Sequence, residues 1–392
     1  MKNNIIEQIK PCPYHKKCGG CSLQNLSYSD QLHFKQVRMI RLLGVFGHVE
    51  EILGMDDPLR YRNKVQAGFL TLNGAVASGV YQSSTGRIVP VDGCLIQNEA
   101  ADKIIATLRK LFQSFKLKPY DSVTKKGFIR HVLVRQGHKS GQIMVVIVTA
   151  EGEFPSKRSF INALINRHPE ITTIVRNINK DMDGLFLGEE SEILLGDGYI
   201  EDSLCDMSFR ISPSSFYQVN SVQAEKLYTK AIELLELTGK ETVIDAYCGT
   251  GTIGLILSKK AKNVIGIELN KAAVDDAVYN ARLNNADNIS FINDDAGRIL
   301  TEIATNREKI DAVITDPPRA GCSKEFLRSL VALSPKRIVY ISCNPETLLR
   351  DLLYLRRKGY RAEVIQPVDM FPYTSHIEAI VLLTKEKPTG LS

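Results

Sequence analysis

The sequence predicts an α/β protein, with a helix-covered parallel sheet over residues 206–392 and an α+β region over residues 1–205. Two observations support this prediction. Apolar strands alternate with helical segments after residue 205, and acidic or reactive residues stand where those strands end. These strand-end residues are Asp245, Glu268, Asp294, Asp295, Asp316 and Cys343. Because ligands of open parallel sheets bind at the carboxyl ends of the strands, we expect a ligand site at that edge.

The segment Val243–Gly254, VIDAYCGTGTIG, reads as a strand, a glycine turn and the start of a helix, which is the opening of a Rossmann-like βαβ unit. Its glycines fit the dinucleotide pattern G-x-G-x-x-G. Asp245 argues against a nicotinamide cofactor, because its carboxylate would repel a pyrophosphate at the helix N-terminus. S-adenosylmethionine, with an ammonium group and a cationic sulfur, fits better, and Glu268 would accept hydrogen bonds from its ribose hydroxyls.

Composition indicates an ordinary soluble protein, with 44% apolar and 24% charged residues among 392. The apolar run Ile143–Val148 is too short to span a bilayer. The first residues, MKNNIIEQIKPC, lack the apolar core of a signal peptide. We therefore expect a cytoplasmic protein that binds no membrane, and a monomer, because nothing indicates an obligate protein partner.

The positive charge is concentrated in the first third of the chain. Residues 1–140 contain 21 Lys and Arg against 10 Asp and Glu, whereas residues 201–392 contain 24 against 25. A polyanion that contacts the first third is therefore expected, and nucleic acid is the obvious candidate. Within this region Leu59–Lys64, LRYRNK, alternates basic and aromatic residues in a way that suits phosphate contact and base stacking.

Four cysteines of the first third indicate a metal site. Cys12, Cys18 and Cys21 lie in one loop rich in Pro and Gly, and Cys94 follows in the turn-like PVDGC. Such a loop cannot bury an apolar face, so packing does not explain the thiols. Four thiolates suit zinc or an iron–sulfur cluster, and the spacing does not choose between these two metals.

The remaining pattern predicts the following elements. Helices are expected over Ser29–Leu43, Glu99–Phe115 and Ser221–Leu237, short strands over residues 65–92, and a hairpin from Phe128–Gln136 and Gln142–Thr149. An acidic, Gly-rich stretch, Asp181–Gly198, precedes the expected domain boundary near residue 205. The segment Ile211–Asn220, ISPSSFYQVN, then brings Gln218 and Asn220 to the start of a helix, where they could cap it or reach a ligand.

Cys343 is the candidate nucleophile. The strand Ile338–Ser342 delivers it, and Asn344 and Pro345 after it suit the N-cap and the first position of a helix. The helix terminus should favour the thiolate. An earlier strand ends in Asp-Pro-Pro (316–318), where Arg319 takes the place of the aromatic residue found in amino-group methylases.

A methyl transferase that acts on C5 of uracil needs such a thiol. Addition of a thiolate to C6 makes C5 nucleophilic enough to attack a sulfonium methyl group, and a base must then remove the C5 proton. By position alone, Glu378 in FPYTSHIE (371–378), at the start of the last strand, reads as a solvated strand-end residue, and His376 is expected two positions before it on the same strand face.

These motifs together resemble the RNA (uracil-5)-methyltransferase family, especially its iron–sulfur members that act on 23S ribosomal RNA. The resemblance rests on the four cysteines and on SFYQVN (215–220), DAYCGTGTIG (245–254), DPPRAG (316–321), SCNPETLLRD (342–351) and FPYTSHIE. It implies a Rossmann-like class I S-adenosylmethionine-dependent methyltransferase domain after an iron–sulfur, RNA-binding region. The implied functional residues are Cys12, Cys18, Cys21 and Cys94 for a [4Fe–4S] cluster, Cys343 as nucleophile, Glu378 as base, and Gln218, Tyr247, Thr252, Glu268, Asp295 and Asp316 around S-adenosylmethionine.

One departure concerns the start of the chain. Many relatives carry an RNA-binding β-barrel, the TRAM domain, before the cluster cysteines, and here Cys12 leaves no room for it. The basic first third is then expected to supply the RNA contact, with the target uridine extruded from its stack. Two alternatives remain: the same reaction on a tRNA loop uridine, or a non-catalytic RNA-binding assembly factor, which Cys343 together with Glu378 disfavours.

Overall fold

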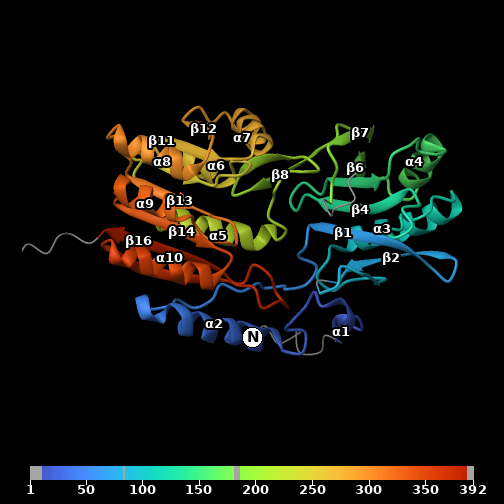
Figure 1. The fold of residues 1–392 in the computed structure, drawn as a ribbon, viewed down its shortest axis with the longest axis horizontal. Coiled ribbons are helices and arrows are strands. Elements are labelled where there is room, and N and C mark those ends of the chain that lie inside the picture. Colours follow the sequence, from blue (N-terminus) through green and yellow to red (C-terminus); the bar gives the residue numbers. More distant parts are fainter. Residues whose placement is uncertain (1–10, 83, 181–185, 386–392) are drawn as a thin grey trace, which may run out of the picture.

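The computed structural model describes residues 11–82, 84–180 and 186–385. The expectation drawn from the first residues, and part of the acidic stretch 181–198, lie outside these ranges. Two large sheets lie side by side along the long axis of the molecule, as Figure 1 shows. The first sheet belongs to the basic part of the chain, and the second belongs to the C-terminal half.

The first sheet has seven strands in the order β3-β2-β1-β4-β5-β6-β7. Their bounds are β1 (Lys64–Leu72), β2 (Ala75–Tyr81), β3 (Ile88–Pro90), β4 (Ile129–Gln136), β5 (Ile143–Thr149), β6 (Ile171–Ile178) and β7 (Glu190–Leu195). The predicted hairpin is confirmed as the antiparallel pair β4–β5. The helices α3 (Glu99–Ser114) and α4 (Lys157–Ile165) cover one face through an apolar core. Strand β7 lies inside the acidic stretch, where the sequence pattern predicted no strand.

The second sheet also has seven strands, in the order β12-β11-β10-β13-β14-β16-β15. Strands β10 to β14 pair in parallel, and β16 pairs antiparallel with both β14 and β15. Their bounds are β10 (Thr242–Ala246), β11 (Asn263–Glu268), β12 (Ile289–Asn293), β13 (Ala312–Thr315), β14 (Arg337–Ser342), β15 (Tyr360–Val368) and β16 (Glu378–Lys385). This arrangement confirms the predicted parallel sheet.

Helices cover both faces of this second sheet. Its strands alternate between two apolar cores: on β10, Val243 faces the core shared with α5, whereas Ile244 faces the core shared with α8, α9 and α10. The helix bounds are α5 (Ser221–Glu233), α6 (Thr252–Ser258), α7 (Lys271–Leu283), α8 (Ala296–Thr305), α9 (Lys324–Leu333) and α10 (Pro345–Arg357). The result is a three-layer αβα domain with its strand ends free for a ligand.

A hairpin of β8 (Ile200–Leu204) and β9 (Met207–Ile211) lies between the two sheets (Figure 1). Its buried side chains share one core with Leu133 and Met144 of the first sheet and with Val243 of the second. The two sheets are therefore joined by continuous apolar packing.

The N-terminal segment crosses from the first sheet to the second. A short helix α1 (His15–Cys18) is followed by α2 (Tyr28–Leu43) and a 3₁₀ turn, η2 (Gly44–Phe46). Helix α2 begins at Ser27, whose hydroxyl accepts the Asp30 N–H at 3.2 Å. It runs beneath α10 (Figure 1), and Met39 and Leu43 pack into the core of the second sheet. We keep the division near residue 205 as a proposal for the two sheets, with α2 grouped by packing with the second.

Within the described ranges, no helix has both the length and the apolar character needed to cross a membrane.

Candidate active site

Four carboxyl groups form an acidic row along the strand ends of the second sheet. Glu268 ends β11, Asp245 lies in β10, Asp316 follows β13 and Glu378 begins β16. Burial, followed by the charges of Asp316 and Glu268, raises the pKa of Asp245 to about 8. Burial, followed by the charge of Asp316, raises the pKa of Glu378 to about 8, and burial raises that of Asp316 to about 7. Neighbouring acids in the row thus affect each other's pKa, and their negative charges favour a cationic ligand.

Asp245 is the clearest sign of an absent cation. Its side chain is fully buried, and neither carboxylate oxygen has a hydrogen-bond partner among the described residues. The Gly254 N–H lies close and partly offsets the rise in pKa, without a hydrogen bond of acceptable geometry. A buried carboxyl group without a partner is costly, and a ligand ammonium or sulfonium would supply the missing interaction.

The glycine turn between β10 and α6 forms one wall of this row. Gly251 has a φ of 79°, and a Cβ there would lie 3.0 Å from both the Ala277 Cβ and the Phe291 ring, so only glycine fits. Glu268 accepts the Gly249 N–H at 3.1 Å and the Asn270 N–H at 2.8 Å. The turn and Glu268 therefore hold each other in place, as the Rossmann-like pattern predicted.

Three other predicted cofactor residues lie around this turn. Tyr247 is half-buried, and its ring packs against Phe326 with centroids 5.2 Å apart. Thr252 is the first residue of α6, and its hydroxyl lies 3.4 Å from that of Thr250. Asp295 is exposed and caps α8 by accepting the Arg298 N–H at 3.0 Å. Their contact with a cofactor stays a prediction.

Gln218 reaches the acidic row through a buried tyrosine. Its side chain lies beside the hydroxyl of Tyr228 on α5, whose pKa is raised by burial and then by Asp316, Glu378 and Asp245. Sequence reasoning missed Tyr228, because on the apolar face of a helix a tyrosine has no distinguishing pattern. Asn220, by contrast, is the N-cap of α5 and accepts the Gln223 N–H at 3.2 Å.

Cys343 lies between β14 and α10, as predicted, and Asn344 caps the helix by accepting the Glu346 N–H at 3.2 Å. The surroundings of the thiol oppose the expected thiolate. Burial, followed by Glu378 and Asp316, raises the pKa of the Cys343 thiol to about 11, and Arg319 acts in the opposite direction. Burial and two acids outweigh the helix terminus, so the thiol is protonated at neutral pH.

The DPPRAG loop is bound to the first turns of α10. The Arg319 carbonyl accepts hydrogen bonds from Asn344 Nδ2 at 2.9 Å and from Thr347 Oγ1 at 3.3 Å, and the Ala320 carbonyl accepts one from Arg350 at 3.1 Å. These contacts keep the exposed Arg319 side chain beside Cys343, where its positive charge lowers the pKa of the thiol.

A cavity of about 250 Å³ opens beside Cys343. Its walls are Arg38, Arg319, Cys343, Asn344, Pro345, Glu346, Ser375, His376 and Ile377. Arg38 belongs to α2, some 300 residues before Cys343, and the sequence gave no sign of its place here. His376 was expected on the strand face of Glu378, but it lies in the loop before β16 and is exposed, whereas Glu378 is buried.

The four candidate metal ligands lie near one another beyond the loop that precedes β16. The charges of Cys94, Cys18 and Cys12, after burial, raise the pKa of Cys21 to about 12. Cys21 and Cys94 both pack against a small apolar cluster that contains Tyr61 and Tyr373. Among the residues that the structure describes, however, no group of three or more His, Cys, Asp or Glu side chains is arranged to hold a metal ion.

The fold and the acidic row define the class of protein: a class I S-adenosylmethionine-dependent methyltransferase. Comparison with known proteins agrees with this class. Residues 185–386 match the family described as tRNA (uracil-5-)-methyltransferase. An uncharacterized RNA methyltransferase from Clostridium tetani is 44% identical over 378 residues, which cover 95% of this chain and 82% of the relative. One from Listeria innocua is also 44% identical, covering 95% and 83%.

A solved structure is similar over nearly the whole chain. It is the Pyrococcus abyssi tRNA (uracil-54, C5)-methyltransferase in complex with S-adenosyl-L-homocysteine, with a TM-score of 0.79 and 30% identity, covering 93% of this chain and 86% of that one. The chain therefore belongs to the tRNA (uracil-5-)-methyltransferase family. It is an enzyme that methylates uracil C5 in RNA with S-adenosylmethionine as methyl donor.

Proposed function

We propose that this enzyme methylates C5 of a uridine through a covalent bond between Cys343 Sγ and C6 of the base, with Glu378 removing the C5 proton. The observation that supports it most is that Glu378 and Asp316 both raise the pKa of Cys343, and that Asp316 raises the pKa of Glu378. The three residues come from three different strand ends, and their charges interact. A thiol, a carboxyl group and a cation-binding row are the three parts that the reaction needs.

In the proposed sequence of steps, the Cys343 thiol gives its proton to solvent, which it regains after the last step, and the thiolate adds to C6, which places electron density on C5. C5 then takes the methyl group, whose donor leaves as the neutral thioether. The Glu378 carboxylate removes the C5 proton, the C5–C6 double bond re-forms, and the Cys343 thiolate is expelled. The raised pKa of Glu378 makes it a stronger base than a surface glutamate.

The methyl donor supplies an electrophilic methyl group when it is bound, and the residues of this chain orient it. We propose that Glu268 accepts the ribose hydroxyls, that Asp245 faces the cationic end, and that Gln218 and Asp316 border the methyl group. Tyr247, Thr252 and Asp295 are proposed as outer contacts. The partnerless oxygens of Asp245 support this orientation.

For the target we propose a uridine of 23S rRNA, as the resemblance of the cluster-type motifs implies, with the modification made in the cytoplasm. The similar Pyrococcus abyssi enzyme, a tRNA (uracil-54, C5)-methyltransferase, favours a tRNA loop uridine as the second candidate. In both cases the basic first third of the chain would contact the phosphates.

One experiment tests both the reaction and the target. The positions of 5-methyluridine are mapped in rRNA and tRNA from a strain that lacks this gene, and from the same strain complemented with wild type or with Cys343→Ala. A position lost on deletion and restored only by wild type supports the proposal and names the RNA. Restoration by Cys343→Ala would refute the covalent mechanism.

We also propose that Cys12, Cys18, Cys21 and Cys94 hold a [4Fe–4S] cluster. Four cysteine thiolates are a suitable set of ligands for such a cluster. To bind one cluster, the four sulfur atoms must lie closer together than in this structure. Anaerobically purified protein should contain about four irons per chain. Stoichiometric zinc without visible absorbance would contradict the cluster and leave the methylation mechanism untouched.

A further inference from the structure

The loop 369–377, which leads from β15 to Glu378 at the start of β16, is held by the N-terminal segment. The Tyr373 N–H donates to Gln31 Oε1 at 2.8 Å, and the Tyr373 carbonyl accepts the Leu23 N–H at 3.0 Å. The Ser375 N–H donates to Ser22 Oγ at 2.8 Å. Residues more than 300 positions earlier in the chain therefore fix the backbone that precedes the proposed base.

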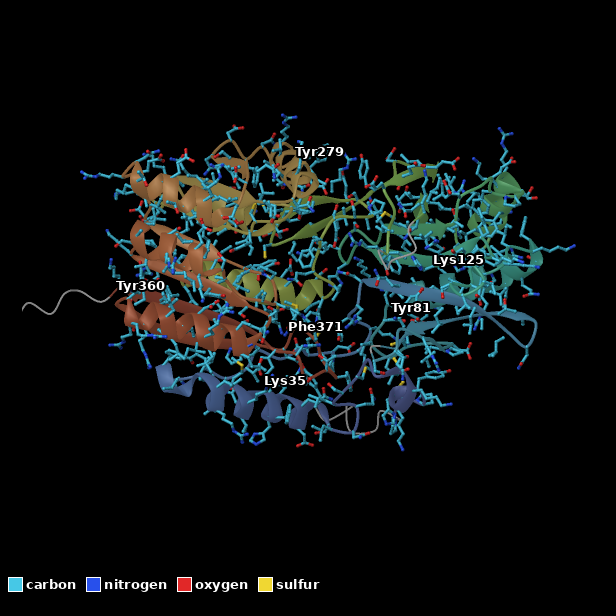
Figure 2. All side chains as sticks on the ribbon, viewed as in Figure 1. Lys35, Tyr81, Lys125, Tyr279, Tyr360 and Phe371 are labelled. Carbon is cyan, nitrogen blue, oxygen red and sulfur yellow. The ribbon has the colours of Figure 1, made fainter. Side chains whose placement is uncertain are left out.

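At the centre of this contact lies a buried ion pair. Lys35 of α2 and Asp369 are both fully buried and bonded to each other, and Tyr28 donates its hydroxyl to Asp369 at 2.8 Å. Lys35 also donates to the Phe371 carbonyl at 3.1 Å. Figure 2 shows Lys35 on α2 close to Phe371 in the loop above it. One ammonium group thus binds both the first residue of the loop and its third.

Among the buried residues of α2, Lys35 is the one that carries a charge. The buried residues Tyr28, Gln31, Lys35, Met39 and Leu43 follow one helical face. Replacement of a buried ion pair by neutral residues of similar volume often leaves stability unchanged. The pair is therefore better explained by the geometry that it imposes on the loop than by stability.

The same loop also shapes the cavity beside Cys343. Ser375, His376 and Ile377 form part of its wall, and Arg38, one turn after Lys35, donates to the Ser375 carbonyl at 2.9 Å. A shift of α2 relative to the loop would therefore move the cavity wall and the start of β16 together. Cys343 itself is delivered by β14 and α10, which α2 reaches through the pair between Arg38 and Glu346. The bonds of Lys35, by contrast, go to the loop.

We propose that Lys35 is a positioning residue for proton abstraction: its bonds to Asp369 and to the Phe371 carbonyl fix the loop 369–377 and so set the direction of the Glu378 carboxyl group. This inference rests on the proposed function of Glu378. Lys35 acts through the loop and touches neither substrate, and its loss should slow the release of product more than the attack of Cys343.

The test compares two steps in the variant Lys35→Met with Asp369→Asn, in which the buried site becomes neutral and the Tyr28 hydroxyl keeps an acceptor. With 5-fluorouridine RNA, the C5 fluorine cannot be removed as a proton, so attack and methyl transfer leave a stable adduct. Its rate of formation measures attack and methyl transfer without proton removal. With ordinary RNA, decay of the methylated adduct measures proton removal.

Lys139→Met is the matched control, because it breaks the Lys139–Glu225 ion pair, which lies away from the loop.

We expect the double variant to form the fluorouridine adduct at nearly the wild-type rate and to release ordinary product about tenfold more slowly or worse, since small misplacements of a catalytic group are costly. Lys139→Met should match wild type in both steps. Release at the wild-type rate by the folded double variant would overturn the proposal, and so would an equal loss in both steps.

If the double variant does not fold, Gln31→Met removes one acceptor of the same loop without a charge. Slowed release with normal attack then supports the proposal, and unchanged release overturns it. Glu378→Gln is run beside these variants. If it forms no adduct, the proposed function itself fails; if it stalls while the double variant releases product normally, only the role of Lys35 fails.

Discussion

At the scale of single residues, the reactivity of Cys343 depends on opposing influences on one sulfur atom. The start of α10 and Arg319 favour the thiolate, whereas burial, Glu378 and Asp316 favour the thiol and raise its pKa to about 11. The balance keeps the thiol protonated until substrate is bound. A protonated thiol is a weak nucleophile, so the free enzyme is protected from side reactions.

The first prediction concerns pH. Because the thiol pKa is raised, the thiolate fraction increases as pH rises, by about tenfold per unit below that pKa. The value of kcat/KM for RNA reports the free enzyme, so it should rise steadily from pH 6.5 to 8.5. Decay of the preformed adduct should rise with pH up to about pH 8, where Glu378 is half deprotonated, and level off above it. Rapid-quench kinetics across this range measures both steps, and a flat kcat/KM profile would contradict the assignment.

The second prediction concerns Asp245, whose pKa of about 8 describes the protein without ligand. A bound cation favours the carboxylate and lowers this pKa. Binding of S-adenosylmethionine below pH 8 should therefore release a proton, and affinity should strengthen as pH rises towards 8. Calorimetry in two buffers of different ionisation enthalpy measures the release. Asp245→Asn should release fewer protons and bind more weakly, and titration of the ligand itself cancels in this comparison. Equal proton release by both proteins would be evidence against the orientation proposed here.

At the scale of elements, short loops that carry functional residues are held by neighbours from the other sheet. Asn63 at the start of β1 donates to the Gln218 carbonyl at 2.9 Å. Arg135 of β4 is fully buried and donates to the carbonyls of Ser212 at 3.3 Å and Ser215 at 3.0 Å. The first sheet therefore fixes the segment that presents Gln218 to the acidic row.

The third prediction tests this support. Arg135→Met removes both hydrogen bonds: the Ser212 carbonyl keeps the Ser215 N–H at 3.3 Å, whereas the Ser215 carbonyl loses its Arg135 donor. This loss should cost about 1–3 kcal/mol of unfolding free energy. The Gln218 segment should loosen, so KM for S-adenosylmethionine should rise several-fold while the fluorouridine adduct still forms at saturating donor. Arg337→Met is the control, because Arg337 donates to the Leu234 carbonyl far from Gln218. A normal KM in a destabilised Arg135→Met protein would show that the contact serves stability alone.

Most elements followed from the sequence because their signals are local. The strand–glycine turn–helix at Val243–Gly254, the hairpin β4–β5 and the cap of α10 at Asn344 depend on neighbouring residues, and all three are confirmed. The docking of α2 did not follow, because periodicity shows which face of a helix is buried and not what covers it. For the same reason Tyr228 and Arg38 were missed, since their partners lie on distant strands.

At the scale of the whole molecule, the chain joins a basic region to an acidic site. Residues 1–140 carry the excess of positive charge, and the acidic row lies on the second sheet. Continuous packing through β8 and β9, and the crossing of α2 beneath α10, hold the two parts together (Figure 1). RNA attracted to the basic region would meet the Cys343 cavity at the place where α2, α10 and the loop 369–377 come together.

The central claim is that Cys343 and Glu378 act at two separate steps on one uridine. Glu378→Gln keeps the shape of the side chain and removes the base. Incubated with RNA and labelled methyl donor, this variant should stall as a covalent protein–RNA adduct that carries the label, seen as a slow-migrating band on a denaturing gel. The double variant Cys343→Ala with Glu378→Gln should give no such band. Free turnover by Glu378→Gln, or RNA binding without adduct, would contradict the account, and His376 would then be the next base to test.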